Sequence, residues 1–233
     1  MAKNILLIKT GSTHAAIRER FGDFDRWFVD NLDNCDVSLM NAVTTGDLPR
    51  PEDHDGVIIT GSPAMVTDRE PWSERLAEWL VLAHGRLPIL GVCYGHQLLA
   101  HALGGSVGWH PQGREIGTVD IQLTAAGETD PLLGSLPGVF SAQVTHAQRV
   151  SRLPPESILL AANDFESHHG FRLGQSTWGV QFHPEFNAAI MKAYLREAQP
   201  ALQREGRDVA ELLAQVTDTD ANGGLLRRFA GLL

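Results

Sequence analysis

Short apolar runs alternate with longer stretches of helical spacing in the first half of this chain. Runs that predict strands buried on both faces cover residues 4–8, 36–40, 56–60 and 88–92, and a late one covers 178–182. Helical spacing follows at residues 21–32, 72–83 and 96–103. This alternation predicts an α/β fold, in which βαβ units build a mostly parallel open sheet with helices on both faces.

The pattern changes after residue 105. Residues 118–123 alternate between apolar and polar side chains, residues 140–145 are strand-like, and glycine and proline punctuate the gaps. We therefore expect additional antiparallel strands in this region. A helix is predicted at residues 188–195, and residues 196–233 are predicted to form a helical tail. We interpret residues 1–195 as one domain, and the tail as part of that same domain.

Composition narrows the class of protein. The chain has 233 residues, 43% of them hydrophobic, and a net charge of -9, which argues against a nucleic acid partner. No apolar run approaches the roughly 20 residues that span a bilayer, and no secretory signal is recognisable, so no membrane association is expected. Two cysteines make a disulfide framework implausible, which favours a cytoplasmic protein. No zinc spacing, phosphate loop or dinucleotide fingerprint occurs, so neither a metal nor a cofactor is expected.

The segment around Cys93 has the form Gly-x-nucleophile-x-Gly, with Gly91 and Gly95 on either side. It lies between an apolar strand and a helical segment, which is the setting of a nucleophile elbow. There the side chain projects from the carboxyl end of the sheet, the helix amino terminus stabilises a thiolate, and backbone N–H groups can receive an oxyanion. Cys93 is therefore the candidate nucleophile. Cys35 lacks this setting and is interpreted as a buried structural residue.

A cysteine nucleophile needs a base, and the base needs an orienting partner. Pro184 favours an extended conformation at His183, and in an extended chain residues i and i+2 point to the same side. Glu185 can therefore fix the tautomer of the His183 ring, and strand 178–182 carries both to the edge of the nucleophile. The ordinary alternative is a surface histidine, and all ten histidines except His146 and His183 are interpreted in that way.

Two distant segments, Gly91-Val-Cys-Tyr-Gly-His-Gln97 and Gly179-Val-Gln-Phe-His-Pro-Glu185, together resemble the two signatures of class I glutamine amidotransferases. Other segments match as well. Thr60-Gly61-Ser62-Pro63 is similar to the oxyanion loop of the family, Arg114-Glu-Ile-Gly117 to a loop that lines its glutamine pocket, and Thr145-His146 to its Ser-His pair. The resemblance covers roughly residues 4–190 and is nearest to the stand-alone GMP synthase-like branch.

This resemblance implies a flavodoxin-like architecture and a glutaminase reaction. Cys93 would attack the side-chain amide of glutamine, His183 would transfer protons and Glu185 would orient His183. The backbone N–H groups of Ser62 and Tyr94 would hold the oxyanion. The resemblance also implies a substrate-binding set, of which His146 is expected to shape the pocket rather than to act as acid or base; the set comprises Gly61, Gln97, Thr145 and His146.

The chain departs from the family pattern at Ser62, where the GMP synthase-like branch usually has glycine, because a loop that needs positive φ tolerates serine less well. Its length also leaves little room for an ATP-dependent synthetase region. Three hypotheses remain. The first is a stand-alone glutamine amidotransferase whose ammonia goes to a separate synthetase subunit or is released. The second is a γ-glutamyl peptide or conjugate hydrolase with the same triad. The third is a non-catalytic regulatory scaffold. The oligomeric state is left open.

Overall fold

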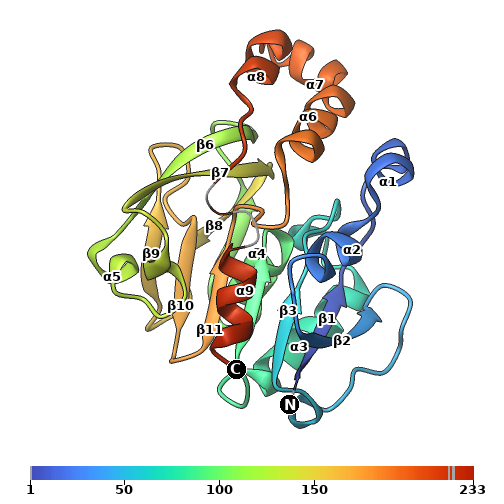
Figure 1. Ribbon diagram of the computed structural model, residues 1–233, viewed down its shortest axis with the longest axis vertical. Helices are drawn as coiled ribbons and strands as arrows, with labels where there is room; N and C mark the ends of the chain where they lie inside the picture. The colour runs from blue at the N-terminus through green and yellow to red at the C-terminus, as the bar shows by residue number, and fades with distance from the viewer. Residues whose placement is uncertain (1, 220, 222–223) are drawn as a thin grey trace.

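The computed structural model describes residues 2–219, 221 and 224–233, and this part of the chain builds a nine-stranded sheet in the order β2-β1-β3-β4-β11-β10-β9-β6-β7 (Figure 1). The first five strands in that order are parallel, and the remaining four are antiparallel to their neighbours. The α/β fold class is therefore confirmed. The five parallel strands match the five apolar runs, and they are β2 (Cys35–Asn41), β1 (Lys3–Lys9), β3 (Gly56–Ile59), β4 (Ile89–Val92) and β11 (Thr177–Val180).

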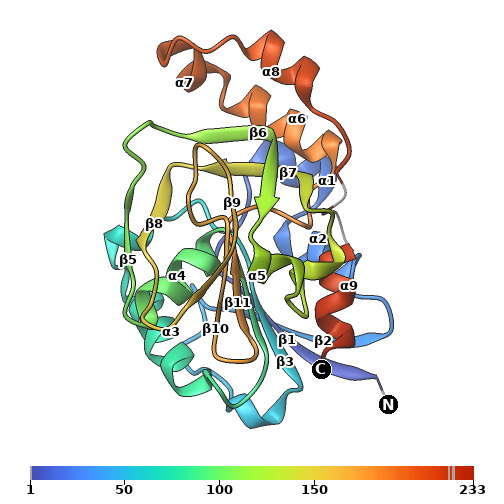
Figure 2. The ribbon, with the colours of Figure 1, turned by 90° about the vertical axis from the view of Figure 1, so that its left-hand side faces the viewer.

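The parallel strands are apolar on both faces because helices cover both faces. In β1, Ile5 and Leu7 join one core cluster, and Leu6 and Ile8 join the other. The views in Figures 1 and 2 place α2 and α9 on the first face and α3 and α4 on the second. These helices are α2 (Phe24–Val29), α9 (Gly224–Gly231), α3 (Pro71–Ala83) and α4 (Tyr94–Ala102).

The antiparallel half contains the two strands expected near residues 118–123 and 140–145, as well as four that the pattern did not predict. The expected pair is β6 (Glu115–Leu123) and β7 (Val139–His146), which pair with each other along eight residues. The additional strands are β9 (Ile158–Ala162) and β10 (Gly170–Leu173) in the main sheet, and β5 (Ser106–Trp109) and β8 (Gln148–Arg152) in a separate two-stranded sheet. A short helix, α5 (Ala125–Glu128), and three 3₁₀ turns, Pro51–Asp53, Val66–Asp68 and Leu133–Ser135, complete the middle of the chain.

The helix predicted within residues 21–32 is confirmed as α2, which is shorter than expected. A helix that the pattern did not predict, α1 (Ala15–Phe21), precedes it, with Gly22 between the two at φ +85°. Glycine adopts this left-handed conformation without steric cost, so the first helix ends there. Asp23 then caps the second helix, because its Oδ1 accepts a hydrogen bond from the N–H of Phe24 at 2.9 Å.

The predicted tail contains several helices, α6 (Ala188–Glu197), α7 (Gln199–Arg204), α8 (Val209–Gln215) and α9. Helices α6 to α8 project beyond the end of the sheet, and α9 returns to pack on the sheet face (Figure 1). Leu225, Leu226 and Phe229 of α9 are fully buried in the first core cluster, together with Trp178 of β11. Residues 220 and 222–223 of the tail lie outside the described residues, and the division at residue 195 stays a prediction.

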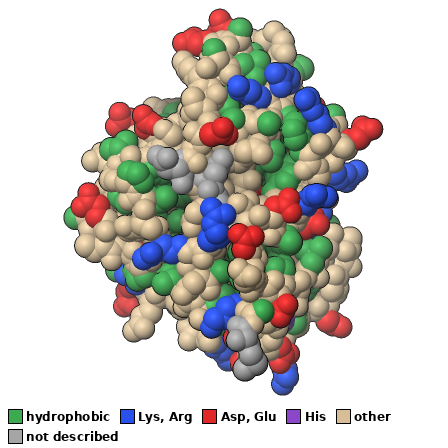
Figure 3. Space-filling view, viewed as in Figure 1, with side chains coloured by type: hydrophobic (Ala, Val, Ile, Leu, Met, Phe, Trp, Pro, Cys, Tyr) green, Lys and Arg blue, Asp and Glu red, His purple; other side chains and the backbone are tan. Residues whose placement is uncertain are grey.

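The surface carries charge of both signs. On the face shown in Figure 3, acidic and basic side chains are interspersed among apolar ones over the sheet and the projecting helices. Within the described part of the chain, no helix is long and apolar enough to cross a membrane.

Candidate active site

The candidate residues meet at the carboxyl ends of the parallel strands, where α/β sheets bind ligands. Loops that follow β3, β4 and β11 carry Ser62, Cys93 and His183 to the floor of a cavity of about 310 Å³. Helix α6 and the segment before α1 form another wall through Tyr194 and Thr13. The predicted site residues that line this cavity are Ser62, Cys93, Tyr94, Gln97, Thr145, His146 and His183.

Cys93 lies at a sharp turn between β4 and α4. Its φ of 52° is in the left-handed region, which a non-glycine residue adopts only when the surrounding structure enforces it. The N–H of Cys93 donates to the carbonyl of Val180 at 2.8 Å, and the two flanking glycines let the elements close up. A Cβ on Gly91 would lie 2.4 Å from the oxygen of Gly95, and one on Gly95 would lie 2.6 Å from the oxygen of Ile59. The turn therefore has the geometry of a nucleophile elbow.

His183 is buried and oriented by Glu185. Its Nδ1 lies 2.7 Å from Oε1 of Glu185, and both side chains are almost completely shielded from solvent. The other ring nitrogen, Nε2, is buried without a hydrogen-bond partner among the described residues, so it is left for the thiol of Cys93. Burial lowers the pKa of His183, but the negative charges of Glu185 and a Cys93 thiolate outweigh burial and raise this pKa to about 10.

Gly61 fits closely between the nucleophile and the base. A Cβ at this position would lie 3.0 Å from Cε1 of His183 and 3.7 Å from Cβ of Cys93. The carbonyl of Gly61 points the other way, because it accepts hydrogen bonds from the hydroxyls of Thr10 and Thr60, each at 2.9 Å. A trans peptide directs its N–H opposite to its carbonyl, so the N–H of Ser62 is turned toward the cavity.

Two backbone N–H groups are available at this floor. The N–H groups of Ser62 and Tyr94 donate no hydrogen bond within the described part of the chain. Ser62 is not among the residues with positive φ, so serine in place of the usual glycine causes no backbone strain here. Its hydroxyl donates to the carbonyl of Thr10 at 2.7 Å and accepts from the N–H of Ala64 at 3.1 Å, which stabilises the loop.

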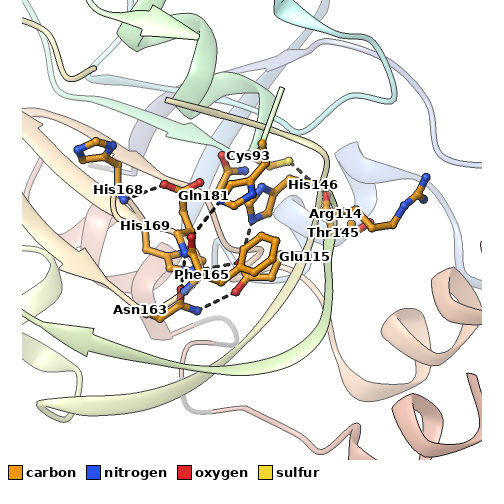
Figure 4. Close-up of polar contacts among 12 residues, drawn as sticks. Cys93, Arg114, Glu115, Thr145, His146, Asn163, Phe165, His168, His169 and Gln181 are labelled. Atoms are coloured by element: carbon orange, nitrogen blue, oxygen red, sulfur yellow. Dashed lines mark hydrogen bonds and ion pairs between the residues drawn. The ribbon is translucent and has the colours of Figure 1, made fainter. Parts of the chain in front are cut away.

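A buried polar network lies behind the cavity wall that contains Thr145 and His146 (Figure 4). The carboxylate of Glu115 accepts from Nε2 of His146 at 2.9 Å and from the amide of Asn163 at 2.8 Å, and Nε2 of His169 lies 3.2 Å away. Burial raises the pKa of Glu115, but the hydrogen bonds from the two histidines outweigh burial and hold this pKa well below its usual range. This network joins β6, β7 and the loop before β10.

Two residues of the expected substrate-binding set are already engaged inside the protein. Nε2 of Gln97 donates to the carbonyl of Gln148 at 2.8 Å and to Oε1 of Gln181 at 2.9 Å, which leaves only its own oxygen for a ligand. Both ring nitrogens of His146 face acceptors, the carbonyl of Gln148 and the carboxylate of Glu115. His146 therefore has no free nitrogen for acid–base chemistry, in agreement with a role in shaping the pocket.

The thiol and the cavity wall are also in contact. Sγ of Cys93 lies 3.8 Å from the carbonyl of Thr145, a weak hydrogen bond that fixes the thiol relative to the end of β7.

The expectation of a surface position is wrong for three histidines, His96, His110 and His169, which are buried. Cys35 lies at the start of β2 and is only partly buried. Within the described residues, no group of three or more histidine, cysteine or acidic side chains is arranged to hold a metal ion.

Sequence reasoning missed several residues of the site. Thr13 and Tyr194 line the cavity and join their hydroxyls at 2.6 Å, although they are 181 positions apart in the chain. Phe186 stacks on the ring of His183 with 4.1 Å between ring centroids. Its position directly after the His-Pro-Glu segment was the only signal for Phe186, and the sequence held none for the Thr13–Tyr194 pair.

A family model described as glutamine amidotransferase class-I matches residues 23–198. This chain belongs to that family. The segments around Cys93 and His183 both lie within the matched residues, and the cavity between them is the candidate active site.

Two curated relatives differ in the share of their own length that this chain covers. A GMP synthase [glutamine-hydrolyzing] of Porphyromonas gingivalis is 38% identical over 132 residues, which are 56% of this chain but only 24% of that protein. Gamma-glutamyl peptidase 3 of Arabidopsis thaliana is 30% identical over 158 residues, 64% of this chain and 63% of that protein. This chain therefore spans about a quarter of the GMP synthase that it matches.

The fold is also found in solved structures. A crystal structure of a glutamine amidotransferase from Thermotoga maritima covers 98% of this chain and is itself covered to 96%, with a TM-score of 0.74 and 22% sequence identity. This similarity extends the shared fold from residues 23–198 of the family model to nearly the whole chain.

Proposed function

We propose that this chain is a glutaminase, which hydrolyses the side-chain amide of glutamine to glutamate and ammonia through a cysteinyl thioester. The observation that carries the proposal is that His183 and Cys93 lie on either side of Gly61, so close that a Cβ at that position would lie 3.0 Å from the ring of His183 and 3.7 Å from Cβ of Cys93, beneath two free N–H groups. The raised pKa of His183 supports a thiolate–imidazolium pair at neutral pH.

In the first half of the reaction, the thiolate of Cys93 attacks the side-chain carbonyl carbon of glutamine. The N–H groups of Ser62 and Tyr94 receive the negative charge that develops on the carbonyl oxygen. The carbon–nitrogen bond then breaks, and Nε2 of His183 gives its proton to the departing nitrogen, which leaves as ammonia. Glu185 holds Nδ1 of His183 throughout, so that Nε2 stays directed at the reacting atoms.

The second half hydrolyses the γ-glutamyl thioester. Neutral His183 takes a proton from water at Nε2, and the hydroxide attacks the thioester carbon in the same oxyanion site. The carbon–sulfur bond breaks, glutamate leaves, and the thiolate–imidazolium pair is restored. The ammonia is released or passed to a separate synthetase subunit. Relatives named as glutamine-hydrolysing GMP synthases support this second fate.

A second candidate, the hydrolysis of γ-glutamyl peptides or conjugates by the same triad, is supported by one comparison. The chain matches a larger share of the Arabidopsis γ-glutamyl peptidase than of the GMP synthase. Trp109, which is 63% exposed at the cavity rim, also offers an aromatic surface to a leaving group larger than ammonia.

A product assay separates these candidates. Purified protein and a Cys93→Ala variant are compared by kcat/KM on glutamine and on a panel of γ-glutamyl amides and peptides. Preferential release of ammonia from glutamine, abolished in the variant, supports the glutaminase. A preference for peptides instead supports the hydrolase. If no substrate is turned over, both proposed activities are contradicted for the isolated chain. That result would favour the regulatory scaffold or a requirement for a partner. Turnover retained by Cys93→Ala would refute the assignment of the nucleophile.

A further inference from the structure

The ring of His183 lies against a second ring that comes from its own turn. The N–H of Phe186 donates to the carbonyl of His183 at 3.3 Å, so residues 183–186 form a tight turn with Pro184 at its second position. This turn brings the Phe186 ring back over the imidazole, with centroids 4.1 Å apart and planes within 20° of each other. The local sequence His-Pro-Glu-Phe thus produces the stack.

Phe186 is itself immobilised. Its side chain is fully buried, and its ring also lies 5.0 Å from the ring of Tyr194 at an interplanar angle of 30°. Trp27 packs edge-on against it at 5.3 Å. The hydroxyl of Tyr194 is tied to that of Thr13 at 2.6 Å. The result is a buried stack of three rings, His183–Phe186–Tyr194, whose last member is anchored by its hydrogen bond with Thr13.

The stack restrains a motion that the other contacts leave open. The hydrogen bond from Nδ1 of His183 to Glu185 fixes one point of the ring. A ring held at one point can still pivot, and pivoting would turn Nε2 away from the sulfur and from the leaving nitrogen. A parallel ring at 4.1 Å blocks this pivot. Its negatively polarised face also attracts the imidazolium, and this attraction adds to those of Glu185 and the Cys93 thiolate.

We propose that Phe186 is a positioning residue for the reaction, which holds the plane of the His183 ring and stabilises its imidazolium form by stacking. This inference rests on the proposed roles of Cys93 and His183. It assigns Phe186 no contact with substrate. The projecting helix α6 contributes to this positioning indirectly, because its residue Tyr194 stacks on Phe186.

The kinetic test compares aromatic and aliphatic residues at one position. Phe186→Met and Phe186→Leu fill most of the volume without a ring, Phe186→Tyr restores the ring, and Phe229→Met in α9 is the control for loosened packing. In Phe186→Met, kcat should fall roughly tenfold with little change in KM. The alkaline limb of kcat/KM should move down by about 0.5 to 1.5 pH units. Phe186→Tyr should retain the wild-type limb, and Phe229→Met should not move it.

A second test needs no substrate. In a Cys35→Ser background, the rate of Cys93 alkylation by iodoacetamide is measured against pH. Loss of the stack weakens the imidazolium, so the pH at which Cys93 becomes reactive should rise in Phe186→Met or Phe186→Leu and stay unchanged in Phe186→Tyr. Identical alkylation profiles in folded aliphatic variants and wild type would overturn the proposal. The expected alkylation shifts without hydrolysis of any amide by the wild type would support the positioning role and contradict the proposed function.

Discussion

His96 should make the stability of this protein sensitive to mild acid. Its ring is completely buried beside Phe171 and close to Gly179, and neither ring nitrogen has a hydrogen-bond partner in the described part of the chain. Burial lowers the pKa of His96 from 6.5 to about 3. Between these two pH values, the side chain of His96 is protonated in the unfolded chain but not in the folded chain. Stability therefore falls as the pH falls through 6.5.

The size of the effect follows from the shift. A pH of 5 is 1.5 units below the pKa of the side chain in the unfolded state, which is therefore protonated, whereas the folded side chain is still neutral. Each unit contributes about 1.4 kcal/mol, so this single residue should reduce the free energy of unfolding by about 2 kcal/mol between pH 7 and pH 5. For a chain of this length, this corresponds to a decrease in Tm of about 4 to 8 °C.

The assay is urea unfolding followed by tryptophan fluorescence at pH 7 and pH 5, for the wild type and for His96→Met. Methionine fills a similar volume and needs no hydrogen-bond partner. The variant should lose about 2 kcal/mol less stability than the wild type over this interval. His14→Met is the matched control for the substitution itself, because His14 is exposed. Equal losses in the wild type and in His96→Met would refute the reasoning.

Three further predictions concern the site and the core. Gly61→Ala pushes a methyl group against the His183 ring, so kcat should fall by about 10- to 100-fold while far-UV circular dichroism stays unchanged; an unaltered kcat would contradict the close contact. Glu185→Gln removes a charge that raises the pKa of His183, so the alkaline limb of kcat/KM should move to lower pH, and an unshifted limb would argue against the pair. Leu225→Ala should lower the free energy of unfolding by about 2 to 5 kcal/mol in urea titrations, since this side chain of α9 is fully buried, and a loss under 1 kcal/mol would show that α9 contributes little.

The parallel half of the fold was predictable because its strands are buried on both faces and therefore read as continuous apolar runs. The strands of the antiparallel half were harder to predict from the sequence. Strand β10 is four residues long and half of it is only partly buried, and β5 is not fully buried at any position. Such strands carry neither a continuous run nor a clean alternation. The helix predicted over residues 21–32 is present but begins only at Phe24, because Gly22 ends the preceding helix α1 and Asp23 caps α2.

The candidate trio of Cys93, His183 and Glu185 could be selected from the sequence because each member lies in a short segment whose local geometry has one main use. Glu115 lies in the segment that resembles a pocket-lining loop, but its pairing with His169 was not predicted, since the sequence separates the two by more than 50 positions and pairing partners at that distance leave no local pattern. The same holds for the commitment of Gln97 to Gln148, which only the packed structure reveals.

Strands β4 and β11 lie side by side in the sheet, but residues 93–176 separate them in the chain. Bringing their ends together costs about 4 kcal/mol of loop entropy from the chain-length dependence alone. The elbow at Cys93 is completed by the hydrogen bond from its N–H to the carbonyl of Val180, and His183 lies three residues beyond Val180, so elbow and base both depend on closing that long segment. Contacts of this range slow folding. During refolding, recovered activity should therefore be a late signal that lags behind the recovery of secondary structure.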